Sequence, residues 1–143
     1  MTERTVRQII EGHKPVTASA DTTVQEAARL MKEHNIGALM VVEGDQLAGV
    51  FTERDALFRV LAGGLDASTQ LSSVMTSSPT TIAPDSPFTA ALHVMHEGHF
   101  RHLPVVEEGR VIGVISVRDA LGPELESFVY EMLRQDQIQE VLA

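Results

Sequence analysis

Apolar residues recur at helical spacing in two separate stretches of the chain. Positions i, i+3, i+4 and i+7 hold Val24, Ala27, Ala28 and Met31 in the first stretch and Phe88, Ala91, Leu92 and Met95 in the second. This period places four side chains on one face of a helix. We therefore predict two amphipathic helices, which end near the polar or glycine breaks at Asn35 and Gly98.

Each predicted helix is followed by two short apolar runs of strand length. Runs 38–42 and 47–51 flank a turn with Gly44, and runs 102–106 and 111–115 flank a turn with Gly109. Turns of this length between β-rich runs indicate hairpins. Pro104 has no N–H for a ladder, so its strand should lie at a sheet edge or turn that position outward. With short helical pieces at 6–10 and 71–75, each half reads β-α-β-β-α and has its own short sheet.

These two halves are copies of one pattern, 64 residues apart. Aligned without a gap, residues 15–57 and 79–121 agree at 16 of 43 positions. A fixed internal period is strong evidence of architecture, and two copies are too few for a solenoid. We predict a pseudo-symmetric α/β (α+β) unit with a cleft between its halves. Its parts are a first repeat at 6–62, a linker at 63–70, a second repeat at 71–121 and a C-terminal amphipathic helix at 122–143.

The C-terminal segment carries an apolar stripe outside both repeats. The stripe contains Leu125, Phe128, Val129, Met132 and Leu133, joined later by Ile138, Val141 and Leu142. An apolar helix face needs a cover. Packing against its own domain and contact with a partner or a second copy are equally compatible with the pattern.

Both copies close on the same polar motif. Residues 49–55 and 113–119 both read Gly-x-x-Thr/Ser-x-Arg-Asp. The Asp carboxylate, at Asp55 or Asp119, can accept two hydrogen bonds from a ribose diol. The hydroxyl of Thr52 or Ser116, at the start of a helix, suits an anion, and the neighbouring arginine can contact phosphate. Plain helix capping uses the same Thr/Ser-x-x-Asp pattern, so a structural role stays open beside the binding role.

Composition narrows the classes of function. The net charge is −9, from 11 basic and 20 acidic side chains, which opposes nonspecific nucleic-acid binding. There is no cysteine, and no apolar run approaches the ~20 residues of a membrane span. The N-terminal residues lack the layout of a signal peptide, so we expect a cytoplasmic protein without membrane contact. No catalytic motif is present, and we expect no enzyme activity.

Four histidines recur every three residues, at His93, His96, His99 and His102. A tetrahedral metal site needs three or four converging ligands. The glycine at 98 ends the helix before His99, and His102 belongs to the next strand, so the four side chains should diverge. We expect no metal site here; the histidines should instead be solvated helix residues or phosphate contacts.

The order and spacing of these motifs resemble a tandem pair of CBS domains, the regulatory module named after cystathionine β-synthase. The resemblance rests on the helix phrase Thr-Val-Gln-Glu-Ala-Ala-Arg-Leu-Met at 23–31, the strand phrase Phe-Arg-His-Leu-Pro-Val-Val at 100–106 and the two closing motifs. It covers about residues 6–121. It implies a non-catalytic sensor in which two halves pack through their sheets and leave two clefts for adenosine-containing nucleotides (AMP, ADP, ATP or NAD(H)).

The resemblance also implies roles for individual residues. The ribose and phosphate contacts would be Thr52, Arg54, Asp55, Ser116, Arg118 and Asp119, with Arg101 as a further phosphate contact. The adenine pocket would use Thr17, Thr81, Ala38, Met40, His102 and Pro104. Because Gly37-Ala38 stands where Arg101-His102 stands in the second copy, the two clefts should differ in charge. The resemblance implies no required cofactor, because the nucleotide would act only as a regulatory ligand. We also expect a homodimer. Its signal would pass to an unidentified protein target. The alternative is a structural or protein-interaction dimer whose clefts are vestigial.

Overall fold

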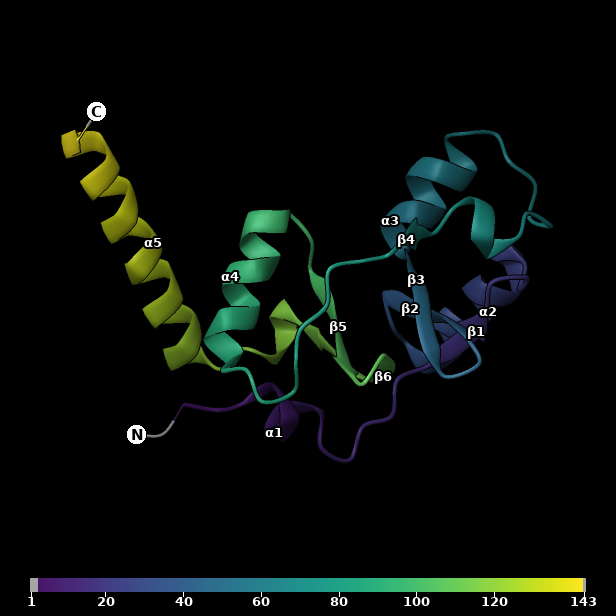
Figure 1. Ribbon diagram of the computed structural model, residues 1–143. Helices are drawn as coiled ribbons and strands as arrows, with labels where there is room; N and C mark the ends of the chain where they lie inside the picture. Colours follow the sequence, from purple (N-terminus) through teal and green to yellow (C-terminus); the bar gives the residue numbers. More distant parts are fainter. Residues whose placement is uncertain (1–2, 143) are drawn as a thin grey trace.

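Two antiparallel hairpins form the centre of the fold, one in each half of the chain (Figure 1). The computed structural model describes the backbone of residues 3–142 and the side chains of residues 3–136. In the first half β2 (Ala38–Glu43) pairs with β3 (Gln46–Thr52), and in the second half β5 (His102–Glu107) pairs with β6 (Arg110–Ser116). The predicted hairpins are therefore confirmed.

The strands of the two halves join into one sheet, in the order β1-β2-β3-β6-β5. Strand β1 (Thr17–Ser19) runs parallel to β2, and β4 (Thr76–Ser77) pairs with β3. The halves meet through the single pair Gln46↔Arg110, so the two short sheets that we predicted are linked end to end. Strand β5, with Pro104, lies at the end of this order as predicted. The second copy of β1 is reduced to one bridge, Ile82↔Val105.

The amphipathic helices α2 (Val24–His34) and α4 (Phe88–Gly98) lie where the apolar period predicts them. All four stripe residues of α4 are buried, whereas Ala28 of α2 is exposed. Helix α2 ends at Asn35 and α4 at His99, both in the left-handed conformation with φ of 52° and 57°. The second helix therefore ends at His99 and not at the predicted Gly98. His99 occupies the position that corresponds to Asn35 in the first half.

The two halves exchange their leading helical segments. Helix α1 (Val6–Ile10) precedes the first repeat but packs into the core of the second, against Phe88 and α4. The short helix η2 (Leu71–Ser73) precedes the second repeat but packs into the core of the first. Backbone hydrogen bonds fix both segments, from Val6 N–H to the Ser86 carbonyl and from Leu71 N–H to the Thr22 carbonyl, each 2.9 Å. Each half therefore needs the other for a complete core.

A third apolar cluster lies between the halves and holds them face to face. Ala38, Met40 and Val50 of the first hairpin are buried there, and Val111 and Val114 of β6 pack against them. The halves therefore pack through their sheets, in agreement with the expected architecture.

Helical segments begin inside both closing motifs. In the first half α3 (Glu53–Asp55) continues into a π-helix, η1 (Ala56–Leu61). In the second half a 3₁₀ turn, η3 (Val117–Asp119), is followed by α5 (Gly122–Leu142). No helix within residues 3–142 is long and apolar enough to cross a membrane.

Helix α5 packs against its own domain with one part of the C-terminal stripe and leaves another part exposed. Phe128 packs against α4, with its ring centroid 5.0 Å from that of His93 and 5.6 Å from that of His96. Leu125, Val129 and Leu133 are exposed. Met132 is half-buried, and the last three stripe residues, Ile138, Val141 and Leu142, lie outside the residues whose side chains are described.

Candidate functional site

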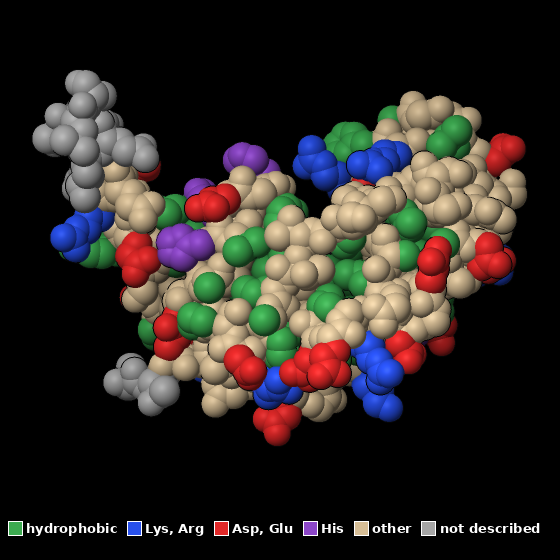
Figure 2. Space-filling view, in the orientation of Figure 1, with side chains coloured by type: hydrophobic (Ala, Val, Ile, Leu, Met, Phe, Trp, Pro, Cys, Tyr) green, Lys and Arg blue, Asp and Glu red, His purple; other side chains and the backbone are tan. Residues whose placement is uncertain are grey.

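A cleft of about 640 Å³ opens between the two halves, which is a usual size for a small-molecule site. Its lining comes from both halves and consists of Gly37, Val50, Thr52, Glu53, Arg54, Leu57, Phe58, Thr76, Pro79, Thr80, His99, Phe100, Arg101, His102 and Pro104. Figure 2 shows the hollow at the top of the molecule, with histidine on one rim and basic side chains on the other.

The cleft brings together five of the thirteen candidate residues that the sequence suggested. Thr52 and Arg54 come from the closing motif of the first half, and Arg101, His102 and Pro104 come from β5 and the segment before it. These groups are about fifty residues apart in sequence and meet because the halves pack face to face. A hydroxyl, two guanidinium groups and an imidazole are donors suited to an anion.

Asp55 and Asp119, the candidate ribose contacts, both take part in helix capping. The Asp55 carboxylate accepts the Thr52 N–H at 2.9 Å, and the Thr52 hydroxyl accepts the Asp55 N–H at 3.2 Å. The Asp119 carboxylate accepts the Ser116 N–H at 2.7 Å. Each capping bond uses Oδ2 and leaves Oδ1 for other contacts. Asp55 is buried, and its Oδ1 lies 3.4 Å from Arg59 Nε.

The other candidate residues do not line this cleft. Thr17 begins β1 and Thr81 lies before β5, and both are exposed. Ala38 and Met40 are buried in the cluster between the halves. Ser116 and Arg118 belong to the closing motif of the second half. They occupy the positions that correspond, 64 residues later, to Thr52 and Arg54.

The charges of the cleft are predominantly basic in an acidic protein. Arg54 and Arg101 take no part in the ion pairs found among residues 3–136. The Arg54 guanidinium lies over the Phe58 ring, 4.8 Å from its centroid, in a cation–π geometry. Glu53 is the single carboxylate in the lining. The local field therefore favours an anionic ligand despite the net charge of −9.

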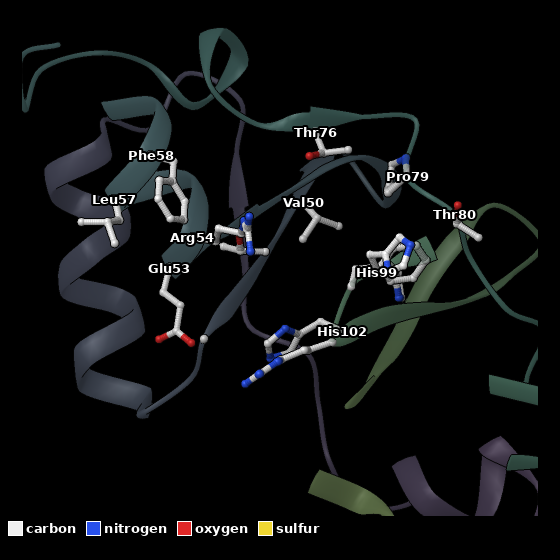
Figure 3. A pocket seen from close by; sticks show the side chains of 15 residues that line it. Val50, Glu53, Arg54, Leu57, Phe58, Thr76, Pro79, Thr80, His99 and His102 are labelled. Carbon is white, nitrogen blue, oxygen red and sulfur yellow. The ribbon is translucent and has the colours of Figure 1, made fainter. Parts of the chain in front are cut away.

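His102 reaches across the cleft to the first half. A Cβ atom added at Gly37 would lie 3.1 Å from Glu53 Oε1 and 3.4 Å from His102 Cε1, so these groups crowd around that glycine. Figure 3 shows His102 and Glu53 extending toward the same space from opposite sides. Burial lowers the pKa of His102 below its usual value. Arg118 and Arg101 also lower this pKa, whereas Glu53 and Asp119 act in the opposite direction.

The glycines of the two closing motifs, Gly49 and Gly113, leave room for the exchanged segments. A Cβ at Gly49 would lie 2.6 Å from Met75 Sδ, and a Cβ at Gly113 would lie 2.8 Å from Ile10. The sequence indicated close approach by a ligand or by the other half. The structure shows that Met75, next to η2, and Ile10 of α1 make this approach.

Several lining residues were missed by the sequence reasoning. Phe58 and Leu57 follow the closing motif on η1, and His99 was not among the thirteen candidate residues. The cation–π pair of Arg54 and Phe58 has a sequence signal, an i, i+4 spacing, that could have identified Phe58. Others, such as Thr76 of β4 and Pro79, lie at the start of the second repeat, where no polar motif indicated a site.

The four spaced histidines separate into two pairs. His93 and His96 contact Phe128 of α5, and His93 Nε2 lies 3.2 Å from Glu131 Oε2. His99 and His102 line the cleft. Within the described part of the chain no group of three or more His, Cys, Asp or Glu side chains is arranged to hold a metal ion.

Known proteins share both the sequence pattern and the fold. The CBS domain model matches residues 6–62 and 71–123. The CBS domain-containing protein YhcV of Bacillus subtilis is 38% identical over 103 residues, which cover 72% of this chain and 74% of that protein. The chain therefore belongs to the CBS domain family, and it contains a pair of these regulatory modules.

Solved CBS-pair structures superpose over most of the chain. A CBS domain protein from Pyrobaculum aerophilum, complexed with AMP, has a TM-score of 0.80 over 89% of this chain and 99% of that one; at 23% identity the likeness concerns the fold. The CBS domain pair of protein MJ0100, in complex with 5′-methylthioadenosine and S-adenosyl-L-methionine, is 27% identical, with a TM-score of 0.74 over 81% of this chain and 95% of that one.

Proposed function

We propose that this CBS pair is a non-catalytic regulatory module that binds an adenosine-containing nucleotide in the cleft between Arg54 and Arg101. The observation that carries the proposal is the pair of guanidinium groups, one from each half, that face a common cleft without ion-pair partners among the described residues. Val50, Phe58 and Pro104 add apolar surface for a purine. A phosphate-bearing ligand, such as AMP, ADP, ATP or NAD(H), supplies the missing negative charge.

The adenosine part of the proposal draws on a neighbour of the same family. MJ0100 holds adenosine compounds in its CBS pair. One of these, S-adenosyl-L-methionine, carries a positive sulfonium, which two arginines disfavour. The charge of the cleft therefore favours phosphates over sulfonium ligands in this protein.

The pseudo-symmetric second cleft, beside the closing motif of the second half, would lack most of the groups that make the described cleft basic. Asn35, Gly37 and Ala38 stand at the positions that correspond to His99, Arg101 and His102. We therefore place the main nucleotide site in the cleft of the first closing motif. Candidate contacts of a second, weaker site are Ser116, Arg118 and Asp119 with Thr17.

Signal output in this proposal passes through a cytoplasmic homodimer to a protein target. Leu57 and Phe58 both line the cleft and are exposed, so bound nucleotide and a partner surface would share side chains. A ligand shifts such an equilibrium only by its differential affinity for the two states.

A second candidate function is a structural or interaction dimer with vestigial clefts. It is favoured by the capping bonds of Asp55 and Asp119 and by the exposed leucines of η1 and α5. Titration calorimetry with AMP, ADP, ATP, NADH, adenosine and S-adenosyl-L-methionine separates the two functions. Saturable binding of a phosphate-bearing ligand supports the sensor, and no heat with any ligand at millimolar concentration contradicts it.

A further inference from the structure

The cleft that contains Arg54 and Arg101 also contains a titratable imidazole. His102 begins β5, lines the cleft and is largely covered. Its ring reaches Gly37 in the other half, within van der Waals range of the space where a side chain at that position would stand. The corresponding position in the first half is Ala38, so this group exists on one side of the pseudo-symmetric pair only.

We propose that His102 lets the cleft distinguish phosphate-bearing adenosine ligands from uncharged ones, because it takes up a proton when a phosphate binds and stays neutral with the nucleoside. This inference rests on the proposed nucleotide site and adds the group that responds to the ligand's charge.

The surroundings of His102 explain why the free imidazole is neutral. Glu53 faces it from α3, Arg118 and Asp119 face it from η3, and Arg101 precedes it in the chain. Arg54 lines the same cleft. Burial is the largest factor that disfavours the imidazolium form of His102. The two arginines also disfavour this form and the two carboxylates favour it. The net effect is a lowered pKa of His102.

A bound phosphate reverses this balance. A phosphate monoester carries about −1.5 to −2 charges at neutral pH. Such a charge beside the ring stabilises the imidazolium and offers it a charge-assisted hydrogen bond. The pKa of the bound state then lies above that of the free state, and binding takes up a proton between the two values. The extra affinity is complete below the lower pKa and is lost as pH rises through the upper one.

The uncharged nucleoside has no such effect. Adenosine fills the purine and ribose space but brings no negative charge, so His102 stays neutral and affinity does not depend on its titration. The difference between AMP and adenosine in proton uptake therefore measures this role directly. General packing by His102 would affect both ligands equally.

The experiment is titration calorimetry of AMP and adenosine near neutral pH, in two buffers with different ionisation enthalpies. For the wild type we expect proton uptake with AMP and none with adenosine. His102→Gln and His102→Asn should lose the uptake that exceeds the phosphate's own titration. Their affinity for AMP should fall about tenfold, and that for adenosine by a clearly smaller factor, since adenosine loses the packing of the ring but no charge-assisted contact. His34→Gln, an exposed residue at the end of α2, is the control and should behave as the wild type.

The outcomes separate the two proposals. Equal proton uptake by the wild type and both His102 variants, or equal uptake with AMP and adenosine, overturns the role of His102 and leaves the nucleotide site intact. If neither AMP nor adenosine binds, the nucleotide site is overturned and this inference with it. Circular dichroism and thermal unfolding confirm that both variants are folded before they are compared.

Discussion

The Arg54 guanidinium lies 4.8 Å from the centroid of the Phe58 ring, so one contact joins the cleft to an exposed helical surface. The two residues are four positions apart on consecutive turns of α3 and η1. A ligand phosphate that drew Arg54 toward it would weaken this contact. In the proposed function, occupancy of the cleft would then change the surface that carries Phe58.

Replacement of Arg54 should reduce affinity for phosphate-bearing ligands selectively. Arg54→Gln removes a charge-assisted contact worth about 1.5–3 kcal/mol, so we expect AMP affinity to fall at least tenfold and adenosine affinity to change little. Calorimetry measures both. Arg29→Gln, at an exposed position on α2, is the control. An equal loss with Arg118→Gln would show that the second cleft, beside Arg118, binds as strongly, contrary to the proposed asymmetry.

The capping role of Asp55 predicts a loss of stability without any ligand. Asp55→Ala and Thr52→Ala each remove part of the reciprocal bonds at the start of α3. Loss of such a cap costs about 1 kcal/mol. Urea unfolding of the nucleotide-free protein should therefore show both variants less stable, whereas Thr52→Ser, which keeps the hydroxyl, should be close to the wild type. Unchanged stability of Thr52→Ala would contradict the capping role.

The sequence predicts the helices and hairpins whose signals are local and occur in both repeats. The apolar period determines α2 and α4, and the hairpins follow from short runs around Gly44 and Gly109, because these signals depend only on neighbours in the chain. The closing motif identified Thr52 and Arg54, both of which line the cleft.

Long-range pairing could not be predicted in the same way. The apolar residues of α1 indicate a buried face but do not say which core receives it, and the structure places Ile10 in the second half. The same limit applies to Met40, which has the right position in the repeat for a cleft but is buried between the halves. His99 depends on a left-handed helix end, which is a backbone property that the histidine pattern did not reveal.

The exchange of α1 and η2 predicts that the motif glycines tolerate no side chain. In Gly113→Ala the new Cβ would lie 2.8 Å from Ile10, and in Gly49→Ala it would lie 2.7 Å from the Thr76 carbonyl oxygen. Overpacking of this kind costs about 1–3 kcal/mol. Thermal unfolding should detect both losses. Gly122→Ala is the matched control, since nothing lies within 4 Å of its new Cβ, and it should leave stability unchanged or raise it slightly.

The start of α5 is held by an ion pair that predicts a pH-dependent part of the stability. Arg4 donates to both carboxylate oxygens of Glu124 and to the Asp119 carbonyl. The hydrogen bond from Arg4 holds the pKa of Glu124 below its usual value, and the Leu121 N–H adds to this lowering. The stabilisation is therefore complete above the unfolded-state pKa and is lost as pH falls through the folded-state pKa.

Urea unfolding between neutral and acidic pH tests this ion pair. Glu124→Gln should be less stable than the wild type at neutral pH, and the difference should shrink as the pH falls below the usual range for glutamate. Glu126→Gln, at an exposed position on the same helix, should follow the wild type throughout. A constant difference between wild type and Glu124→Gln at every pH would contradict the charge-based explanation.

Exposed apolar side chains on η1 and α5 predict how two copies would associate. Leu57, Phe58 and Leu61 are exposed on η1, and Leu125, Val129 and Leu133 are exposed on α5. Arg54 and Arg59 flank the first surface, whereas Glu126 and Asp136 flank the second. In a two-fold dimer, η1 against η1 would bring like charges together, and η1 against α5 of the other copy would bring opposite charges together. We therefore expect a head-to-tail dimer.

Cysteine cross-linking distinguishes the two arrangements because the chain has no cysteine of its own. Leu61→Cys and Val129→Cys are made separately, one of them with a tag that changes its size, and then mixed under mild oxidation. A head-to-tail dimer requires mixed disulfides between the two variants and little disulfide in either variant alone, since η1 then faces α5. Disulfides within each variant alone would establish the opposite orientation. If Arg54 couples the cleft to this surface, saturating AMP should change the rate of cross-linking at Leu61→Cys, and adenosine should change it less.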